Sequence, residues 1–95
     1  MHAIQVTTTG GPEVLTYTEV DNPAPTEEQL LVDVSVAGVN YIDTYYREGI
    51  YNASTPFILG LEGTGRVVHD PQGEIAESTM VAWDHALGSY AEQVC

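Results

Sequence analysis

The sequence contains no lysine, and its 2 basic residues, Arg47 and Arg66, face 14 acidic ones. The resulting net charge of −12 repels phosphate backbones and anionic lipid surfaces. We therefore expect no role in binding nucleic acid or a membrane. Such acidity also destabilises the compact state by self-repulsion unless salt screens the charges. We expect a salt-adapted, halophilic protein, and an ordinary acidic protein is the alternative.

Cysteine is equally scarce, because Cys95 is the only one in 95 residues. An internal disulfide and a cysteine-based metal cluster are therefore excluded, and the composition suits a reducing cytoplasm. No apolar run approaches the roughly 20 residues that a membrane-spanning helix needs, and the start at Met1 does not resemble a signal peptide. A chain of this length makes one domain. We expect a single cytoplasmic domain.

The clearest strand pattern covers Gln29 to Ala37, where large apolar residues alternate with mostly small or polar ones. We expect this strand at the centre of a sheet. Further strand patterns cover residues 1–7, 15–20, 57–68, 80–83 and 89–94. Short strands separated by turn residues are typical of a mostly antiparallel barrel or sandwich. Residues 71–80 fit no strand or helix pattern.

Glycines at positions 60, 63 and 65 interrupt the pattern of residues 57–68. Glycine inside a strand marks a bulge or the close approach of another backbone, and we expect such contacts here. The spacing differs from the G-x-G-x-x-G of nucleotide-binding loops, and no helical pattern follows. We therefore set aside a phosphate-binding role for this segment.

The densest chemistry lies between Gly38 and Tyr51, a stretch that holds four tyrosines, an amide, a carboxylate and an arginine. Asn40 is suited to cap a helix, and Asp43 three residues later completes a pair that resembles a capping box. Gly49 is suited to end the helix in a left-handed conformation. We predict one short helix, from about Tyr41 to Glu48.

Each chemical feature of this helix has a structural alternative. Asp43 and Arg47 lie one turn apart, so they form either a solvated salt bridge or part of a site. The four tyrosines, at positions 41, 45, 46 and 51, place several hydroxyl groups near one point. They either recognise a flat, oxygen-bearing ligand or simply pack the helix onto a sheet.

Five segments follow one another in the order and approximate spacing of one known domain: Gly11–Leu15, Val36–Tyr45, Arg47–Tyr51, Pro56–Gly65 and Leu87–Glu92. Through them the chain resembles the N-terminal GroES-like domain of the zinc-free, zeta-crystallin-like quinone oxidoreductases, a branch of the medium-chain dehydrogenase/reductase superfamily. The resemblance covers nearly the whole chain. It implies that residues 1–95 form a partial β-barrel with one short helix. A Rossmann domain that binds NADPH would form the other wall of the cleft, and it is absent from this chain.

The resemblance also implies a reaction, hydride transfer from NADPH to a quinone or a related conjugated carbonyl such as an enone. The residues that would line the nicotinamide and substrate pocket are Asn40, Asp43, Tyr45, Arg47 and Tyr51. Tyr45 and Tyr51 would donate hydrogen bonds to nucleotide or substrate oxygens. Arg47 and Asn40 would orient the acceptor or stabilise charge on its oxygen. Asn40 and Tyr45 are the contacts expected for the cofactor.

Zinc-dependent members of the superfamily resemble this chain but place a cysteine near Asn40 and a histidine at the position of Leu61. Neither residue present here suits zinc, so the resemblance implies a site without metal. We expect a structural role for the neighbouring Glu62, with Arg66 as its partner. The three histidines, at positions 2, 69 and 85, lack metal-binding spacing.

The chain departs from the family pattern in residues 71–80, which lack the usual turn and Gly-Asp-Arg-Val segment, so we expect a rearranged edge there. Two other functions stay open: a non-catalytic small-molecule-binding module, or pseudoenzyme, and a structural barrel that acts through assembly. Because only one wall of the cleft is present, these 95 residues alone should not reduce quinones. An exposed interdomain face should also make them self-associate.

Overall fold

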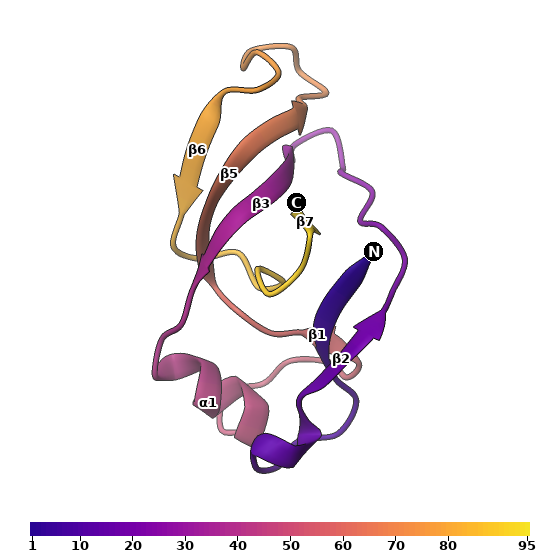
Figure 1. Cartoon of the computed structure of the whole chain (residues 1–95), viewed down its shortest axis with the longest axis vertical. Coiled ribbons are helices and arrows are strands. Elements are labelled where there is room, and N and C mark those ends of the chain that lie inside the picture. The colour runs from indigo at the N-terminus through magenta and orange to yellow at the C-terminus, as the bar shows by residue number, and fades with distance from the viewer.

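The computed structural model covers all 95 residues and shows two antiparallel sheets and one short α-helix (Figure 1). The strands are β1 (His2–Val6), β2 (Thr16–Glu19), β3 (Leu31–Gly38), β4 (Phe57–Ile58), β5 (Glu62–His69), β6 (Met80–Trp83) and β7 (Gln93–Val94), and the helices are the 3₁₀ turn η1 (Pro12–Val14) and α1 (Ile42–Glu48). One sheet has the order β2-β1-β4 and the other β6-β5-β3-β7. The predicted mostly-β fold with one short helix is confirmed, as an open arrangement rather than a closed barrel.

β3 is an interior strand, as its alternating pattern predicted, because it pairs with β5 on one side and β7 on the other. Its apolar face is not uniformly buried, however. Val32 is 5% exposed, whereas Val36 is 63% exposed. A register shift between Val34 and Val36 explains the difference, because such a bulge changes the direction in which the following side chains point.

Glycine allows β5 to lie close to its neighbours. A Cβ atom at Gly63 would lie 2.7 Å from the Val36 carbonyl oxygen and 2.7 Å from the Trp83 ring. At Gly65 it would collide with the Asp33 carbonyl group. The close backbone approach predicted for these glycines is thus confirmed, and a larger residue at either position would force the strands apart.

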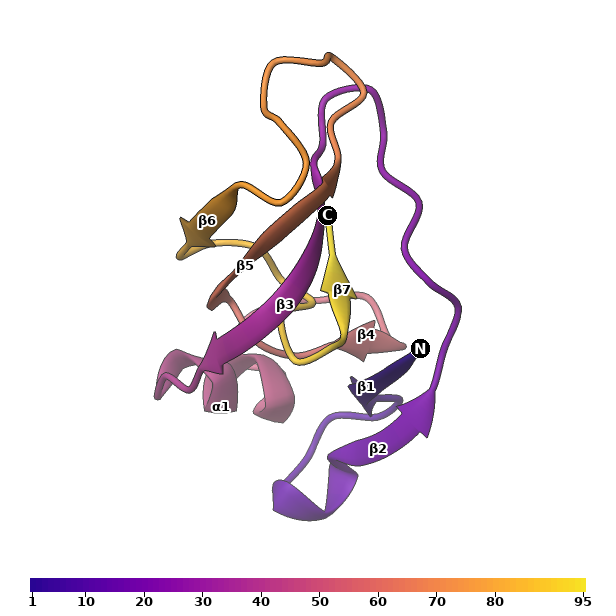
Figure 2. The ribbon, with the colours of Figure 1, turned by 45° about the horizontal axis from the view of Figure 1, so that its top comes forward.

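The C-terminal strand is shorter than predicted. Instead of continuing a strand from Ser89, the chain bonds through Tyr90 to two other segments. The Tyr90 N–H donates to the Leu59 carbonyl at 2.9 Å, and the Tyr90 carbonyl accepts from the Ile4 N–H at 2.8 Å. Ala91 then forms a single bridge with Ala3. Figure 2 shows this part of the chain leading into β7, the edge strand of the second sheet that lies nearest the first sheet. Residues 89–94 therefore link the two sheets instead of forming one continuous strand.

Residues 71–80 are all exposed: 71–79 belong to the loop between β5 and β6, at the far end of the molecule from α1, and Met80 begins β6 (Figure 1). The Asp70 carboxylate organises its first half, because it accepts backbone hydrogen bonds from Gln72, Glu74 and Ile75 at 2.8–2.9 Å. These bonds, led by the one from Ile75, lower the pKa of Asp70. A loop held by one carboxylate has no apolar periodicity, so its sequence showed no recognisable pattern.

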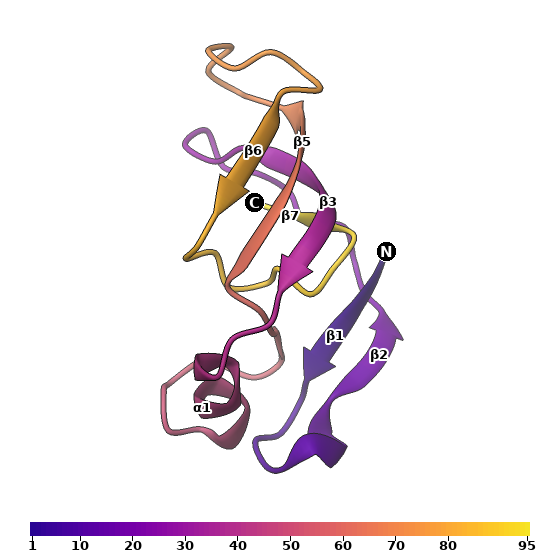
Figure 3. The same ribbon diagram turned by 60° about the vertical axis from the view of Figure 1, so that its left-hand side comes forward.

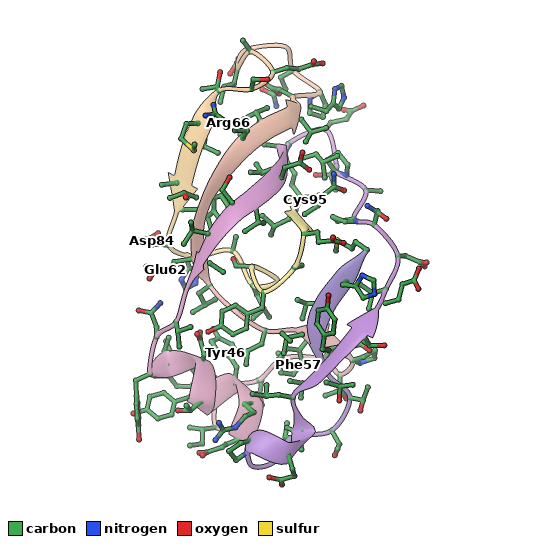
Figure 4. The ribbon with its side chains drawn as sticks, viewed as in Figure 1. Tyr46, Phe57, Glu62, Arg66, Asp84 and Cys95 are labelled. Carbon is green, nitrogen blue, oxygen red and sulfur yellow. The ribbon has the colours of Figure 1, made fainter.

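The apolar core is small and lies beside α1. Val6, Phe57 and Leu59 form a buried cluster. The partly buried residues packed on it are Val14, Tyr46, Ala53 and Tyr90. Figure 4 shows Tyr46 and Phe57 between α1 and β1. The helix is therefore attached to the first sheet through apolar contacts, and with seven residues it is far too short to cross a lipid bilayer.

Candidate active site

The candidate site is built on the corner where β3 leads into α1. Figure 3 shows the helix just beyond the end of β3, off the edge of the second sheet. Gly38 ends the strand, and a Cβ atom there would collide with the Glu62 side chain. At the other end of the helix Gly49 has a φ of 86°, and its N–H bonds to the carbonyls of Tyr45 and Tyr46. Gly49 thus ends the helix as predicted.

Only half of the predicted capping box forms. The Asp43 carboxylate reaches back to the backbone N–H of Asn40, with 3.1 Å between Oδ2 and N. The predicted cap by the Asn40 side chain is wrong, because α1 begins one residue later than predicted, at Ile42, and its N-cap residue is Tyr41, which makes no side-chain cap. The Asn40 carbonyl accepts the Asp43 N–H at 3.0 Å instead. The backbone of Asn40 is therefore fixed on both sides, while its amide side chain takes no part in capping.

Asp43 is 4% exposed and bonds to Tyr90, a residue 47 positions away in the chain. The Tyr90 hydroxyl donates a hydrogen bond to the same Oδ2 that accepts from the Asn40 N–H. Oδ1 is buried without a hydrogen-bond partner. The carboxylate therefore lies inside the domain, beneath the corner rather than on its surface.

Tyr90 is a residue of this region that the sequence did not single out. Burial raises the pKa of its phenol well above the ordinary 10.0, and the hydrogen bond to Asp43 and the charges of Asp43 and Glu62 raise it further. The phenol therefore stays protonated and remains a donor. The only sequence signal was the segment Leu87–Glu92, which carried part of the family resemblance without indicating a contact to α1.

The four tyrosines divide between the two predicted roles. Tyr46 packs against the core, so the structural alternative holds for this residue, and its ring also meets the Tyr51 ring edge-on, with 5.5 Å between centroids. The Tyr45 ring makes edge-on contacts with the rings of Tyr41 and Tyr51, each with 5.5 Å between ring centroids. Tyr41 is 77% exposed and Tyr51 44%. Tyr41, Tyr45 and Tyr51 thus form a contiguous aromatic patch, here called the tyrosine surface.

Arg47 does not form a salt bridge with Asp43, which was one of the two alternatives for this pair. Its Nε donates to the Gly10 carbonyl at 3.2 Å, and its Nη2 lies 3.0 Å from Glu48 Oε1. Asp43 bonds to Asn40 and Tyr90 instead, so the two side chains, although one turn apart on the helix, have different partners. Arg47 joins the end of α1 to the chain before η1, and the structure does not bring it together with Asn40.

Tyr51 is the one predicted site residue that also borders a hollow of about 360 Å³. The other lining residues are Thr7, Thr8, Thr9, Gly49, Asn52, Ala53 and Thr55. Hydroxyl and amide groups dominate this lining. The hollow therefore extends the tyrosine surface with uncharged hydrogen-bonding groups.

No group of three or more His, Cys, Asp or Glu side chains is placed to hold a metal ion. The predicted pair of Glu62 and Arg66 is also not formed, because Arg66 donates to the Ser78 carbonyl at 2.9 Å. Four strand positions place the Cα atoms of the two residues about 13 Å apart, and the Arg66 guanidinium bonds to Ser78 instead. Figure 4 shows them at different heights along β5.

Comparison with known proteins gives a match to a family model over residues 26–95, and that family is described as the alcohol dehydrogenase GroES-like domain. A probable quinone oxidoreductase of Schizosaccharomyces pombe is 35% identical over 94 residues, which are 94% of this chain and 28% of that protein.

Two solved structures have the same fold. The quinone oxidoreductase of Pseudomonas syringae pv. tomato aligns with a TM-score of 0.92 and 38% identity, over 97% of this chain and 30% of that one. The Escherichia coli quinone oxidoreductase, complexed with NADPH, gives a TM-score of 0.89 and 34% identity over 98% and 30% of the two chains. This chain thus spans less than a third of the length of these relatives.

Proposed function

The chain belongs to the family of alcohol dehydrogenase GroES-like domains, and from this premise we propose that it is the substrate-binding part of an NADPH-dependent quinone oxidoreductase. The resemblance seen in the sequence motifs is confirmed at the level of the family. The observation that carries the proposal is the tyrosine surface beside Asn40, whose side chain is not used in capping. Relatives named as quinone oxidoreductases support the same substrate class.

The groups at this surface suit a nicotinamide ring and a quinone. Exposed aromatic rings pack against a flat ligand, and phenol hydroxyls and an amide donate hydrogen bonds to its oxygens. We assign Asn40 and Tyr45 to the cofactor and substrate oxygens and Tyr51 to the outer wall, next to the hydroxyl-lined hollow. When bound, NADPH supplies the hydride. The residues of this chain position the acceptor and stabilise negative charge on its oxygen.

Asp43 and Arg47 enter the proposal in supporting roles. Asp43 is buried, so it acts beneath the surface rather than on a ligand. Arg47 is held by Gly10 and Glu48, and it secures the end of the helix that carries the tyrosines. We further propose that the reaction is independent of zinc, since Asn40 and Leu61 stand where zinc-dependent members resembling this chain place ligands. A cytoplasmic location is part of the proposal.

The proposal places the NADPH-binding domain outside these 95 residues. A chimaera tests it, in which this chain replaces the matching segment of the Escherichia coli enzyme. We expect the chimaera to oxidise NADPH in the presence of a quinone, and the 95-residue chain alone to show no such activity. In the chimaera, Asn40→Ala should lower kcat/KM about 100-fold, as the loss of an oxyanion donor does.

Tyr17→Phe is the matched control, because Tyr17 lies on β2, outside the tyrosine surface, and should leave the rate unchanged. A folded chimaera that binds NADPH but reduces none of several quinones and enones would contradict the proposed substrate class. Steady NADPH oxidation by the chain alone would contradict the division of the site between two domains.

A further inference from the structure

We propose that Asp43 and Tyr90 form a positioning pair that fixes the backbone of Asn40 at the β3–α1 corner. Tyr90 belongs to the segment between the two sheets, and Asp43 to the first turn of α1. The link therefore connects the rigid part of the domain to the residue that presents the amide. The functional meaning of the pair rests on the proposed role of Asn40 at the ligand, whereas its geometry does not.

The Tyr90 end of the pair is firmly anchored. Its backbone bonds to Leu59 at 2.9 Å and to Ile4 at 2.8 Å, so two separate segments hold the same residue. Its ring lies against Gly60, which has a φ of 96° and where a Cβ atom would collide with the ring. The ring also packs on the cluster that contains Phe57. The position of the phenol oxygen is therefore set by the core.

The Asp43 carboxylate connects the fixed Tyr90 phenol to the β3–α1 corner. One oxygen, Oδ2, accepts from both the Tyr90 hydroxyl and the Asn40 N–H. The Asn40 carbonyl in turn accepts the Asp43 N–H, which closes a ring of bonds between the two residues. If the Tyr90 bond is lost, the carboxylate keeps only partners within its own turn of chain. The corner would then move independently of the core.

The burial of Asp43 favours a specific task over simple packing. Removing a carboxylate from water is costly, and here one of its oxygens has no hydrogen-bond partner to offset that cost. An apolar side chain would fill the same space without this cost. Unlike an apolar side chain, the carboxylate provides an acceptor for both the Tyr90 phenol and the Asn40 N–H. A shared acceptor of this kind is needed to hold the β3–α1 corner in place.

Amide hydrogen exchange on the 95-residue chain, followed by NMR, tests the pair without any ligand. We expect Tyr90→Phe to speed exchange at Asn40 at least about tenfold, because the hydrogen bond to the carboxylate loses its anchor. The amide of Val67, which bonds to Thr79 at 3.0 Å, reports on the sheet and should keep its rate. The Asn40 amide proton should also shift upfield as its bond to Asp43 weakens.

Tyr46→Phe is the matched control, since Tyr46 packs on the same core cluster but takes no part in the pair. Unchanged exchange at Asn40 in Tyr90→Phe, or an equal acceleration at Asn40 and Val67, would overturn the proposal. The second outcome would mean that Tyr90 only stabilises the domain as a whole.

Two substitutions at position 43 keep the test valid if Tyr90→Phe fails to fold. Asp43→Asn retains an acceptor oxygen and should preserve most of the protection at Asn40, whereas Asp43→Leu should abolish it. Equal protection in both variants would overturn the proposal. Because no NADPH or quinone is present, failure here leaves the proposed function standing, and failure of the chimaera to reduce quinones leaves this result standing.

Discussion

Within α1, residues that look alike in the sequence have different environments. Tyr45 lies at the tyrosine surface, whereas the adjacent Tyr46 packs on the core. Asp43 is buried and bound to Tyr90, while Arg47, one turn later, bonds to Gly10. Helical spacing identifies which side chains share a face, but the neighbouring segments decide what each face meets.

The stability of the domain should depend on Tyr90 in a pH-dependent way. At neutral pH, Tyr90→Phe should lower the free energy of unfolding by about 1–3 kcal/mol, because it removes a donor from a buried carboxylate. The folded-state pKa of Tyr90 is raised by burial and by the facing Asp43 and Glu62. The contribution of Tyr90 to the free energy of unfolding is therefore fully present at pH values below its ordinary pKa of 10.0. This contribution is lost as the pH rises from 10.0 toward the raised pKa of the folded state.

Urea unfolding of the wild type and of Tyr90→Phe, at pH 7 and at about pH 11, measures this effect. The difference between the two proteins should shrink at the higher pH. Tyr46→Phe should show no such dependence. A difference that stays constant, or grows, with pH would show that the phenol of Tyr90 does not remain protonated in the fold.

At the scale of elements, a single exposed carboxylate organises the loop between β5 and β6. The backbone bonds that lower the pKa of Asp70 make its ionised form the one that holds the turn. The stabilisation is therefore present above its ordinary pKa of 3.8 and is lost as the pH falls through the lower, folded-state value. The hydrogen bonds that hold this loop are local and do not depend on packing of the apolar core.

Asp70→Ala should therefore speed amide exchange at the three residues that bond to the carboxylate, while the exchange rates in β3 and β5 stay the same. The three residues are Gln72, Glu74 and Ile75. Wild-type protein brought to about pH 2 should show the same local change. Exchange in the loop that is equally fast before and after the substitution would contradict this assignment.

The whole molecule carries its charge on the outside, because Asp43 is the only buried acidic residue. A net charge of −12 on a chain with a small core produces self-repulsion that unfolding relieves. Salt shortens the range of this repulsion, from about 10 Å at 0.1 M to about 3 Å at 1 M. Self-association through exposed apolar residues such as Val39 and Ile50 stays a prediction at this scale.

The melting temperature should therefore rise when KCl is increased from about 0.05 M to 1 M and beyond, which is the behaviour expected of a salt-adapted protein. Thermal unfolding followed by circular dichroism measures it. A variant in which several exposed Glu residues, such as Glu27, Glu28 and Glu77, are changed to Gln should depend less on salt. If the melting temperature of the wild type is indifferent to KCl, the halophilic interpretation is wrong.

The sequence by itself determined the family, the mostly-β fold, the central place of β3 and the extent of α1 to within one residue. These features depend on local signals: alternation of apolar residues, glycine at close approaches and glycine at the end of a helix. Motifs in a fixed order carried the resemblance, because each motif meets a separate local requirement of the same fold.

Only the tertiary structure decided the partners of the charged and polar side chains. Asp43 bonds to Tyr90 rather than Arg47, and Arg66 bonds to the Ser78 carbonyl rather than Glu62. Spacing along the chain shows which pairs are possible within one helix or strand. It does not show that Tyr90, 47 residues away, lies beneath the helix, because that contact depends on how the two sheets and the segment between them pack.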